Sequence, residues 1–248
     1  MFIINHLPKK RQNLLFSATM PPKIREMARR ILHQPAEINI SISKPNEKIV
    51  QQAFIVYDTQ KIPLVKYLLT HKDYKSVLVF CSSKQSVKEL TKILQRAKLN
   101  VDEIHSDLDQ SKREEVLIQF KSRRLPILIA TDILSRGIDI DNIELVINYD
   151  VPHDGVDYVH RIGRTARAEA DGTAYTLVGP KEQYKLAAIE KLIGKEVHGY
   201  VFMHDKKTGT TTIKVNPHVN EEAVKIKIKT IKSSLLIIYL GPKWWFYC

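Results

Sequence analysis

The chain has 248 residues, 44% of them hydrophobic, which is enough for one well-packed core and excludes a disordered or fibrous protein. Its 39 basic and 27 acidic residues give a formal net charge of +12, which indicates a polyanionic partner such as a nucleic acid or an acidic membrane surface. The sequence shows no long apolar stretch, no basic amphipathic helix with a bulky apolar face and no signal-peptide pattern, so we expect a cytoplasmic protein without membrane contact.

The N-terminal region predicts one strand, one helix and a linker. Leu14 to Phe16 predicts a strand, and Ser17-Ala18-Thr19 forms its polar end. Pro21 to Leu32 predicts a helix that Pro22 starts, because proline is favoured in the first helical turn. The stretch from Ile42 to Val50 is polar and turn-prone, which predicts an interdomain linker.

The middle of the chain alternates short apolar runs with longer amphipathic stretches. The runs predict strands at Ala53–Tyr57, Ser76–Phe80, Val101–Ile104, Ile127–Ala130, Leu145–Asn148 and Thr173–Val178. The stretches predict helices at Lys61–His71, Lys84–Lys98, Gln110–Lys121, Gly155–Arg161 and Lys181–Ile193. This alternation predicts an α/β domain with a parallel sheet covered on both faces. Ligand sites of such sheets lie beyond the carboxyl ends of the strands, where we expect Ser82, Ser83, Thr131 and Asp132.

The segment from His160 to Arg167 concentrates three arginines around one histidine. On a helix, His160, Arg164 and Arg167 would share one face, and Val159, Ile162 and Ala166 would share a neighbouring, buried face. Guanidinium groups grip phosphate oxygens through two hydrogen bonds and stay charged at any working pH. The segment therefore predicts a phosphate clamp, and a solvated basic surface helix remains the alternative.

Five segments occur in a recognisable order and spacing. They are Ser17-Ala18-Thr19, Val77 to Lys84, Gln110 to Lys121, Ala130 to Ile140 and Tyr158 to Arg167. These segments resemble motifs III, IV, IVa, V and VI of the DEAD-box ATP-dependent RNA helicases, superfamily 2 enzymes with two RecA-like domains. The resemblance covers roughly residues 1 to 198 and implies a RecA-like sheet.

The resemblance also implies a domain organisation. Residues 1–41 would be the last strand and helix of the first RecA-like domain, 42–50 the linker and 51–198 the C-terminal RecA-like domain. Residues 199–248 would form a divergent, lysine-rich tail. The sequence contains neither a Gly-x-x-x-x-Gly-Lys-Ser/Thr loop nor an Asp-Glu-Ala-Asp run, which hold ATP and Mg²⁺ in the family. We therefore expect ATP with Mg²⁺ to be held mainly by the first domain, and this chain alone to lack ATPase activity.

On the ATP side, the resemblance assigns roles to six residues. Arg164 and Arg167 would be arginine fingers that reach the γ-phosphate across the domain cleft. His160 and Arg161 would contact acidic and polar groups of the first domain. Asp139 would bind the ATP ribose and, with Gly137 of the same motif, belong to the interdomain site. A turn or cap aspartate before Asp141-Asn142 is the alternative for Asp139.

On the RNA side, the resemblance points to Thr131, Arg113 and Ser83. Hydroxyl and guanidinium groups aimed at phosphates give affinity without reading bases, which suits an enzyme that accepts many sequences. Each has a local alternative. Thr131 would cap the following turn, Arg113 would be an exposed helix charge near Glu114, and Ser83 would be the N-cap of the helix from Lys84.

Ser17 and Thr19 match the motif that couples the ATP state to RNA binding in the family, and hydroxyls at a strand end are the alternative. Where the family usually has glycine, this chain has Ala166, and we expect little effect because alanine is small. Cys81 and Cys248 are the only cysteines, and neither lies at zinc-ligand spacing from a histidine, so we expect no disulfide framework and no metal site.

Residues 199–248 depart from the family. Lys225 to Lys229 alternates with period two, Leu235 to Leu240 is apolar, and Trp244-Trp245-Phe246 ends the segment with aromatics. Three interpretations are open: an RNA-binding extension, an extra hairpin packed on the core, or out-of-family sequence from a truncated or frame-shifted gene. We favour the last, and expect that deleting residues 199–248 leaves RNA affinity unchanged.

The leading hypothesis is the C-terminal part of an ATP-dependent RNA helicase that couples ATP hydrolysis to RNA binding and local duplex unwinding. Its expected partners are RNA and the first RecA-like domain, and we expect a monomer. Two alternatives remain, a non-catalytic RNA-binding or annealing module and a DNA-directed superfamily 2 helicase.

Overall fold

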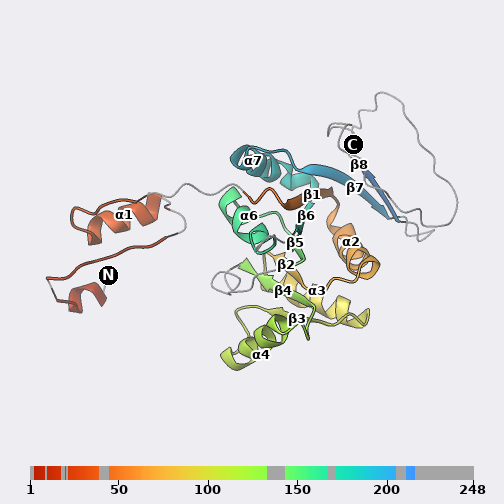
Figure 1. Ribbon diagram of the computed structural model, residues 1–248, viewed down its shortest axis with the longest axis horizontal. Helices are drawn as coiled ribbons and strands as arrows, with labels where there is room; N and C mark the ends of the chain where they lie inside the picture. Colours follow the sequence, from red (N-terminus) through yellow and green to blue (C-terminus); the bar gives the residue numbers. More distant parts are fainter. Residues whose placement is uncertain are drawn as a thin grey trace. The chain divides into compact units, whose positions relative to one another are not determined.

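The computed structural model describes residues 3–8, 10–17, 20, 22–38, 45–132, 143–166, 171–204 and 211–215. All of these residues belong to the first of the two units into which the chain divides, Met1–Asn216 (Figure 1). Among the helices of these residues, none is long and apolar enough to cross a membrane.

The N-terminal region contains a short 3-10 helix, η1 (Ile3–His6), and α1 (Pro22–Ile31). Pro22 opens α1, as the sequence predicts. The predicted strand at residues 14–16 is wrong: these residues form no strand, because the described part of the chain gives them no neighbour for a hydrogen-bonded ladder. Leu14 and Phe16 are accordingly 69% and 89% exposed. An apolar run forms a strand only where a partner strand is available to complete its hydrogen bonds.

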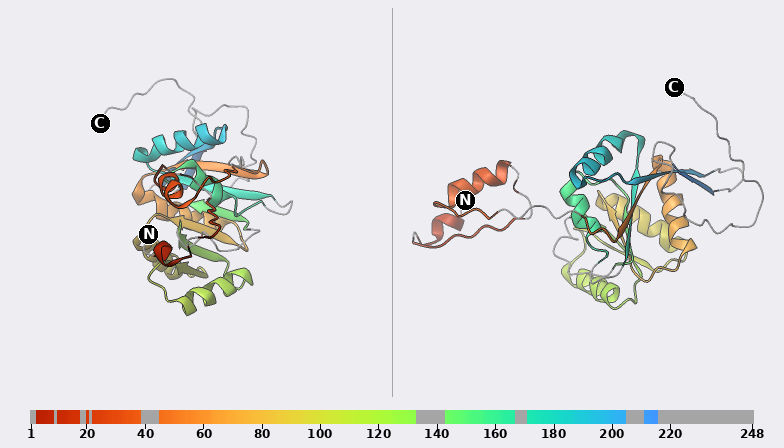
Figure 2. Two further views of the ribbon diagram at one scale, coloured as in Figure 1. Left: turned by 90° about the vertical axis from the view of Figure 1, so that its left-hand side faces the viewer. Right: turned by 45° about the horizontal axis from the view of Figure 1, so that its top comes forward.

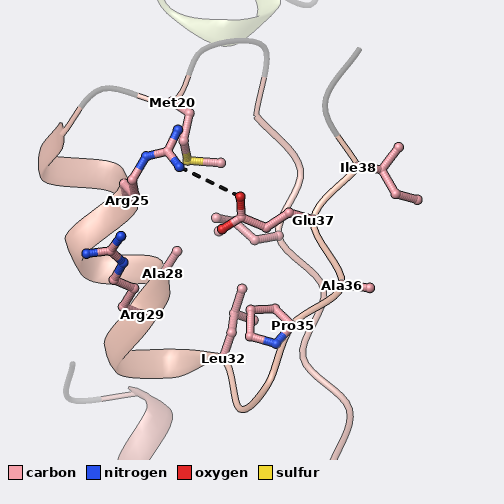
Figure 3. A pocket seen from close by; sticks show the side chains of 10 residues that line it. Met20, Arg25, Ala28, Arg29, Leu32, Pro35, Ala36, Glu37 and Ile38 are labelled. Atoms are coloured by element: carbon pink, nitrogen blue, oxygen red, sulfur yellow. Dashed lines mark ion pairs between the residues drawn. The ribbon is translucent and has the colours of Figure 1, made fainter.

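Two local contacts connect α1 to its flanking chain. The side-chain amide of Asn13 donates to the carbonyl of Ile31, the last residue of α1, at 3.2 Å. Arg25 pairs with Glu37 at 3.7 Å across a small hollow of about 110 Å³ that α1 and the following chain enclose (Figure 3). No residue of α1 is fully buried, and its apolar residues Ile24, Ala28 and Ile31 are half-buried.

The eight strands of the described residues form one sheet. They are β1 (Ile49–Ile55), β2 (Val77–Cys81), β3 (Val101–Ile104), β4 (Ile127–Thr131), β5 (Leu145–Asn148), β6 (Gly172–Val178), β7 (His198–His204) and β8 (Thr211–Val215). Their order is β3-β4-β2-β5-β6-β1-β7-β8, parallel except for β8, which runs antiparallel to β7. The predicted parallel α/β architecture is confirmed.

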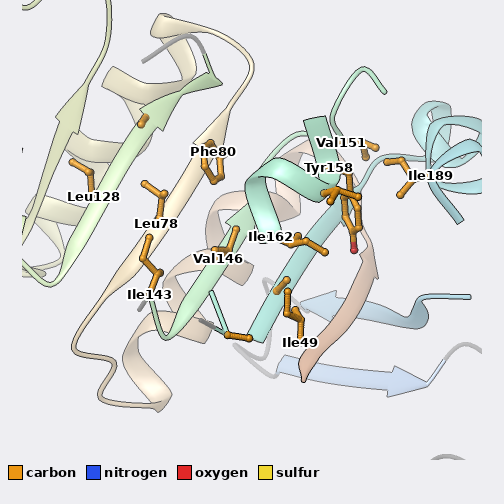
Figure 4. Close-up of a cluster of buried hydrophobic side chains, with 14 of the residues drawn as sticks. Ile49, Leu78, Phe80, Leu128, Ile143, Val146, Val151, Tyr158, Ile162 and Ile189 are labelled. Atoms are coloured by element: carbon orange, nitrogen blue, oxygen red, sulfur yellow. The ribbon is translucent and has the colours of Figure 1, made fainter. Parts of the chain in front are cut away.

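Helices cover both faces of this sheet (Figure 2). Their bounds are α2 (Asp58–His71), α3 (Lys84–Arg96), α4 (Gln110–Lys121), α6 (Gly155–Ile162), η2 (Pro180–Glu182) and α7 (Gln183–Ile193). Alternate residues of a strand point to opposite faces of the sheet, so the sheet contributes side chains to two hydrophobic cores, one on each face. One core packs the sheet against α4, α6 and α7 and includes Tyr158 and Ile162 (Figure 4). The other packs it against α2 and α3.

The sheet continues beyond residue 198, the predicted end of the domain. Residues 52–55 of β1 pair in parallel with residues 198–201 of β7. Tyr200 stacks on Phe54 with ring centroids 5.5 Å apart, and its hydroxyl accepts a hydrogen bond of 3.4 Å from the side-chain amide of Gln52. For residues 198–204 and 211–215 the structure therefore agrees with the hairpin interpretation, and residues 205–210 and 216–248 lie outside the described residues.

Candidate functional site

Two neighbouring parallel strands, β2 and β4, end at one edge of the sheet next to polar residues. β2 ends at Cys81 and is followed by Ser82 and Ser83, and β4 ends at Thr131. Cys81 and Thr131 are register partners, so the ends of β2 and β4 lie side by side. The structure thus brings together the hydroxyl residues that the sequence places at the carboxyl edge.

Ser83 is the N-cap of α3. Its hydroxyl oxygen accepts a hydrogen bond of 3.0 Å from the amide of Ser86 and lies 2.9 Å from the Ser86 hydroxyl. The local alternative for Ser83 is therefore observed. It leaves room for a ligand role, because Ser83 is exposed and its hydroxyl proton is not required by the cap.

Arg161 lies inside the domain, with only 4% of its surface exposed. Its Nε and Nη2 donate to the two carboxylate oxygens of Asp132, both at 2.6 Å. Its Nη1 donates to Asn148 Oδ1 at 3.2 Å and to the carbonyl of Asp150 at 3.0 Å, and the guanidinium lies over the Phe80 ring. Four of its five N–H groups thus bind residues of its own domain. Arg161 holds the site together rather than reaching out of it.

Asp150 is the second centre of this network. Its Oδ2 accepts hydrogen bonds of 2.8 Å from both the amide and the hydroxyl of Ser82, and its Oδ1 accepts one of 3.1 Å from the ammonium of Lys61. Burial disfavours the charged Asp150 carboxylate, but the hydrogen bonds from Ser82 and the Lys61 charge outweigh it, and its pKa lies below the ordinary value. Asp150 is therefore ionised at neutral pH.

Lys61 is almost completely buried in α2, with 4% of its surface exposed. Three carboxylates surround its ammonium, from Asp150 at 3.1 Å, Asp58 at 3.4 Å and Glu182 at 3.6 Å. Burial alone would lower the pKa of Lys61, but these carboxylates outweigh it and raise the pKa above the ordinary value. The ammonium is the counter-charge that stabilises the partly buried Asp150 carboxylate.

The described part of the arginine-rich segment, His160 to Ala166, is helical only at its start. α6 ends at Ile162, where the amide of Gly163 still donates to Val159 at 2.8 Å. Beyond it, Thr165 bridges to Ile143, and its hydroxyl donates to the Ile143 carbonyl. The predicted helix at Gly155–Arg161 is confirmed to within one residue, and the condition for a helical face shared by His160 and Arg164 is not met, because the chain leaves the helix before Arg164. Both side chains are half-buried.

The apolar side of the same segment agrees with its prediction. Val159, Ile162 and Ala166 are all buried in the core. Ala166, however, has φ +53°, in the left-handed region where a side chain costs roughly 1–2 kcal/mol. The expected small effect of alanine in place of glycine stays a prediction, and this backbone conformation is the feature that opposes it.

Arg113 lies in α4 and is partly buried. Its Nη1 donates to Gln110 Oε1 at 3.2 Å and its Nη2 to the carbonyl of Leu108 at 3.3 Å. Its Nε is buried without a hydrogen-bond partner among the described residues. These contacts fix the guanidinium at the start of α4 by neutral groups, so its positive charge is not cancelled by an ion pair in the described part of the chain.

The remaining predicted site residues lie in the N-terminal region or outside the described residues. Ser17 is described and exposed, in the N-terminal region. Four predicted residues lie outside the described residues: Thr19, Gly137, Asp139 and Arg167.

The sequence analysis missed Lys61, Asn148 and Asp150. Asn148 ends β5, and Asp150 follows two residues later, so the rule that polar residues gather after parallel strands would have found both. Lys61 carried no such signal, because one lysine on an amphipathic helix usually faces solvent.

Residues 60–169 match the family model described as helicase conserved C-terminal domain. Among curated proteins, the chain is 39% identical over 196 residues to the ATP-dependent RNA helicase CshA of Listeria monocytogenes, covering 79% of this chain and 38% of that protein. It is 40% identical over 190 residues to the ATP-dependent RNA helicase DeaD of Buchnera aphidicola, covering 76% of this chain and 31% of that protein. The chain spans about a third of the length of these relatives.

Three solved structures are similar. A DEAD box protein of Methanococcus jannaschii is 38% identical with a TM-score of 0.58, over 79% of this chain and 53% of that chain. The Escherichia coli DEAD-box protein SrmB, bound to regulator of ribonuclease activity A, is 34% identical with a TM-score of 0.58, over 62% and 91%. Saccharomyces cerevisiae Dbp5, bound to RNA and ADP BeF3, is 29% identical with a TM-score of 0.71, over 80% and 54%. With this sheet order, this polar edge and these relatives, the chain belongs to the DEAD-box family of ATP-dependent RNA helicases, and it contains the family's C-terminal RecA-like domain.

Proposed function

We propose that this chain is the C-terminal part of an enzyme that couples ATP hydrolysis to RNA binding and local separation of RNA duplexes. One observation carries the proposal. The register pair of Cys81 and Thr131 sets the ends of β2 and β4 side by side, so that Ser83 and Thr131 lie at one polar edge of the sheet. Family membership supports the assignment of RNA and ATP to this edge.

RNA is the proposed ligand of the hydroxyl side of this edge. Ser83, Thr131 and Arg113 offer two hydroxyls and one guanidinium, groups that bind phosphate oxygens without reading bases. The net charge of +12 adds a long-range attraction for a polyanion. The similar Dbp5 structure, which contains RNA, supports this choice of ligand.

ATP with Mg²⁺ is the proposed ligand on the other side, shared with a first RecA-like domain. We assign the arginine-finger role to Arg164 and Arg167, the interdomain contact to His160 and Gly137, and the ribose contact to Asp139. Arg164 follows α6 and is half-buried, which suits a cation that presents part of its guanidinium to a neighbouring domain. When bound, the nucleotide would supply the phosphoryl group whose charge these cations stabilise.

The first RecA-like domain is the proposed partner. The chain carries neither of the family's phosphate-loop and Asp-Glu-Ala-Asp sequences, so we propose that it has no ATPase activity by itself. We propose that this partner holds most of the ATP and its Mg²⁺. We assign coupling between ATP and RNA to Ser17 and Thr19. That the protein is monomeric and cytoplasmic stays a prediction.

Reconstitution tests this proposal. The full chain is mixed with a separately expressed first RecA-like domain of a similar helicase, and ATP hydrolysis is measured with and without single-stranded RNA. We expect RNA-stimulated hydrolysis from the mixture, none from this chain alone, and a loss of roughly 10³-fold or more in the Arg164→Ala variant. The Arg96→Ala variant, at an exposed site in the last turn of α3, is the matched control and should keep full activity. A mixture without stimulation would refute the proposal.

An RNA-binding or annealing module is the second candidate, favoured by the net charge. The two candidates differ in how binding responds to Thr131→Val, which removes one hydroxyl and keeps the shape and charge. A site-specific contact predicts that Thr131→Val binds RNA more weakly. Binding by charge alone predicts that its RNA affinity is unchanged. Parallel titrations with single-stranded DNA of the same sequence test the DNA-directed alternative, which predicts equal or tighter binding of DNA.

A further inference from the structure

A chain of polar contacts runs along the carboxyl edge of the sheet, next to the residues of the proposed RNA site. It passes from Asp132 to Arg161, from Arg161 to the Asp150 main chain, and from the Asp150 carboxylate to Ser82 and Lys61. Each contact lies between 2.6 and 3.1 Å. The network therefore joins the ends of β2 and β4 to helices α2 and α6.

Asp150 is the residue at which these contacts meet. Its carboxylate binds Ser82 through Oδ2 and Lys61 through Oδ1, while its carbonyl binds Arg161. No other described residue touches the turn after β2, helix α2 and helix α6 by hydrogen bonds at once. A substitution of the Asp150 side chain therefore releases the turn after β2 and helix α2, while the main-chain contact with Arg161 in α6 stays in place.

The contact with Ser82 bears directly on Ser83. Two hydrogen bonds of 2.8 Å, one of them from the main-chain amide, fix the peptide that leads into Ser83. Hydrogen bonds from an amide to a carboxylate are short and strong, so this turn has little freedom. The Ser83 hydroxyl then takes its direction from this turn and from its cap contact with Ser86.

The contact with Arg161 bears on the neighbouring strand. Arg161 holds both oxygens of Asp132, which directly follows Thr131. A two-pronged arginine–carboxylate pair is rigid, because the planar guanidinium allows one arrangement. Asp150 thus stands between the residue that precedes Ser83 and the pair that adjoins Thr131.

We propose that Asp150 is a positioning residue for RNA binding. It holds the Ser82–Ser83 turn in place against the Asp132–Arg161 pair, so that the hydroxyls of Ser83 and Thr131 face one RNA backbone. Asp150 acts through these neighbours and does not touch RNA. The inference rests on the proposed RNA site and adds to it a residue that governs its geometry.

The test compares two substitutions that change the net charge equally. Asp150→Asn and Glu182→Gln each remove one negative charge near Lys61, but Glu182 contacts neither Ser82 nor Arg161 in the structure. The added positive charge alone would tighten binding of a polyanion. We expect Asp150→Asn to weaken single-stranded RNA binding by the full chain about 10-fold, against that trend, through the loss of charge-assisted hydrogen bonds. Glu182→Gln should bind at least as tightly as the parent chain.

A double-mutant cycle with Ser83→Ala identifies the route of the effect. If Asp150 acts by placing Ser83, the double variant binds RNA within about 2-fold of the weaker single variant, because the two changes remove one interaction. Full additivity of the two losses would overturn the proposal. So would an Asp150→Asn variant that is folded and binds normally, or an equal loss in Glu182→Gln.

Two further measurements cover the cases in which this comparison fails. If Asp150→Asn does not fold, Ser82→Ala replaces it, since it removes one hydrogen bond at an exposed residue, and an unchanged RNA affinity then overturns the proposal. If the parent chain binds no RNA, the proposed function fails by itself. The positioning role is then read from NMR without RNA: shifted Ser83 amide signals in Asp150→Asn but not in Glu182→Gln support it, and unchanged signals refute it.

Discussion

The side-chain amide of Asn46 donates a hydrogen bond of 2.8 Å to the main-chain carbonyl of Ala166. The two residues stand 120 positions apart, one in the predicted linker and the other in the arginine-rich segment. The Asn46 side chain also accepts a hydrogen bond of 3.0 Å from the amide of Lys48, so both of its polar atoms are used. The linker is thereby anchored to the segment that carries the proposed arginine fingers.

This anchor predicts a measurable loss in Asn46 variants. Asn46→Ala removes a partly buried hydrogen bond and should lower the free energy of unfolding by about 1 kcal/mol. Asn46→Asp should cost more, because a carboxylate would then face the Ala166 carbonyl without a donor. Urea unfolding of both variants checks this, with Glu47→Ala at the adjacent exposed site as control. Equal stability of all three variants would contradict the anchor.

The ends of α3 and α4 give a second prediction. Lys98 and Arg123 have φ +63° and +62°, the left-handed conformation that usually belongs to glycine after a helix. In α3 the amide of Leu99 donates to the carbonyl of Leu94 and that of Lys98 to Gln95, which is a Schellman ending. Lys98→Gly should therefore raise the free energy of unfolding by about 1 kcal/mol, since glycine carries no side-chain penalty there.

A matched control stands one residue earlier. Ala97 has φ −80°, so Ala97→Gly relieves no strain and should be neutral or slightly destabilising. Thermal unfolding of the two variants measures the difference. A Lys98→Gly variant no more stable than Ala97→Gly would show that the left-handed turn costs nothing.

These helix ends also show how far the sequence carries. The period of the apolar residues predicts α3 and α4 almost completely, because helix existence follows from a face that repeats over several turns. The stop at Arg96 is not predictable in the same way. No glycine marks it, and the left-handed turn is imposed by the packing of the next strand rather than by local preference.

The same distinction between predictable and unpredictable features applies to the candidate site. The positions of Ser82, Ser83 and Thr131 follow from strand ends, which a sequence pattern locates. The role of Arg161 does not, because its burial depends on Asp132 and Asn148, which reach it from other strands. Residues of one motif thus point to different places, and only the tertiary structure separates Arg161 from Arg164.

The Arg161–Asp132 pair gives a third prediction. Arg161→Lys keeps the positive charge but replaces a planar fork by a point charge, so several buried acceptors lose their donors. We expect the free energy of unfolding to fall by roughly 3 kcal/mol, the cost typical of breaking a buried pair. Arg96→Lys, at an exposed position of α3, should change it by less than about 0.5 kcal/mol. Similar small losses in both variants would show that the pair contributes little.

The ionised state of Asp150 gives a prediction for pH. Its pKa in the folded protein lies below the unfolded value of 3.8, mainly because the Ser82 amide and Lys61 oppose the effect of burial. A lowered pKa stabilises the folded state above the unfolded value, and this stabilisation is lost as the pH falls through the folded value. The stability advantage of the parent chain over Asp150→Asn should therefore be constant near neutral pH and shrink below 3.8.

Lys61 works in the opposite sense. Its pKa in the folded protein lies above 10.5, so its stabilisation is complete below that pH and is lost only as the pH rises through the folded value. Urea unfolding from about pH 3 to pH 7 therefore isolates the carboxylate. Asp73→Asn, an exposed site, serves as control. A constant advantage of the parent chain down to the lowest pH would contradict an ionised, paired Asp150.

The hairpin of β7 and β8 predicts where the chain tolerates truncation. Deleting residues 199–248 removes Tyr200 and exposes Phe54, which is 3% exposed in the complete sheet, and it strips β1 of its outer neighbour. Loss of this aromatic contact should lower the free energy of unfolding by about 3 kcal/mol. Deleting residues 216–248 keeps β7 and β8, so it should leave both the unfolding free energy and RNA affinity unchanged. Equal stability of the two truncated chains would mean that the hairpin adds nothing to the sheet, and weaker RNA binding after the shorter deletion would favour the RNA-binding interpretation of the tail.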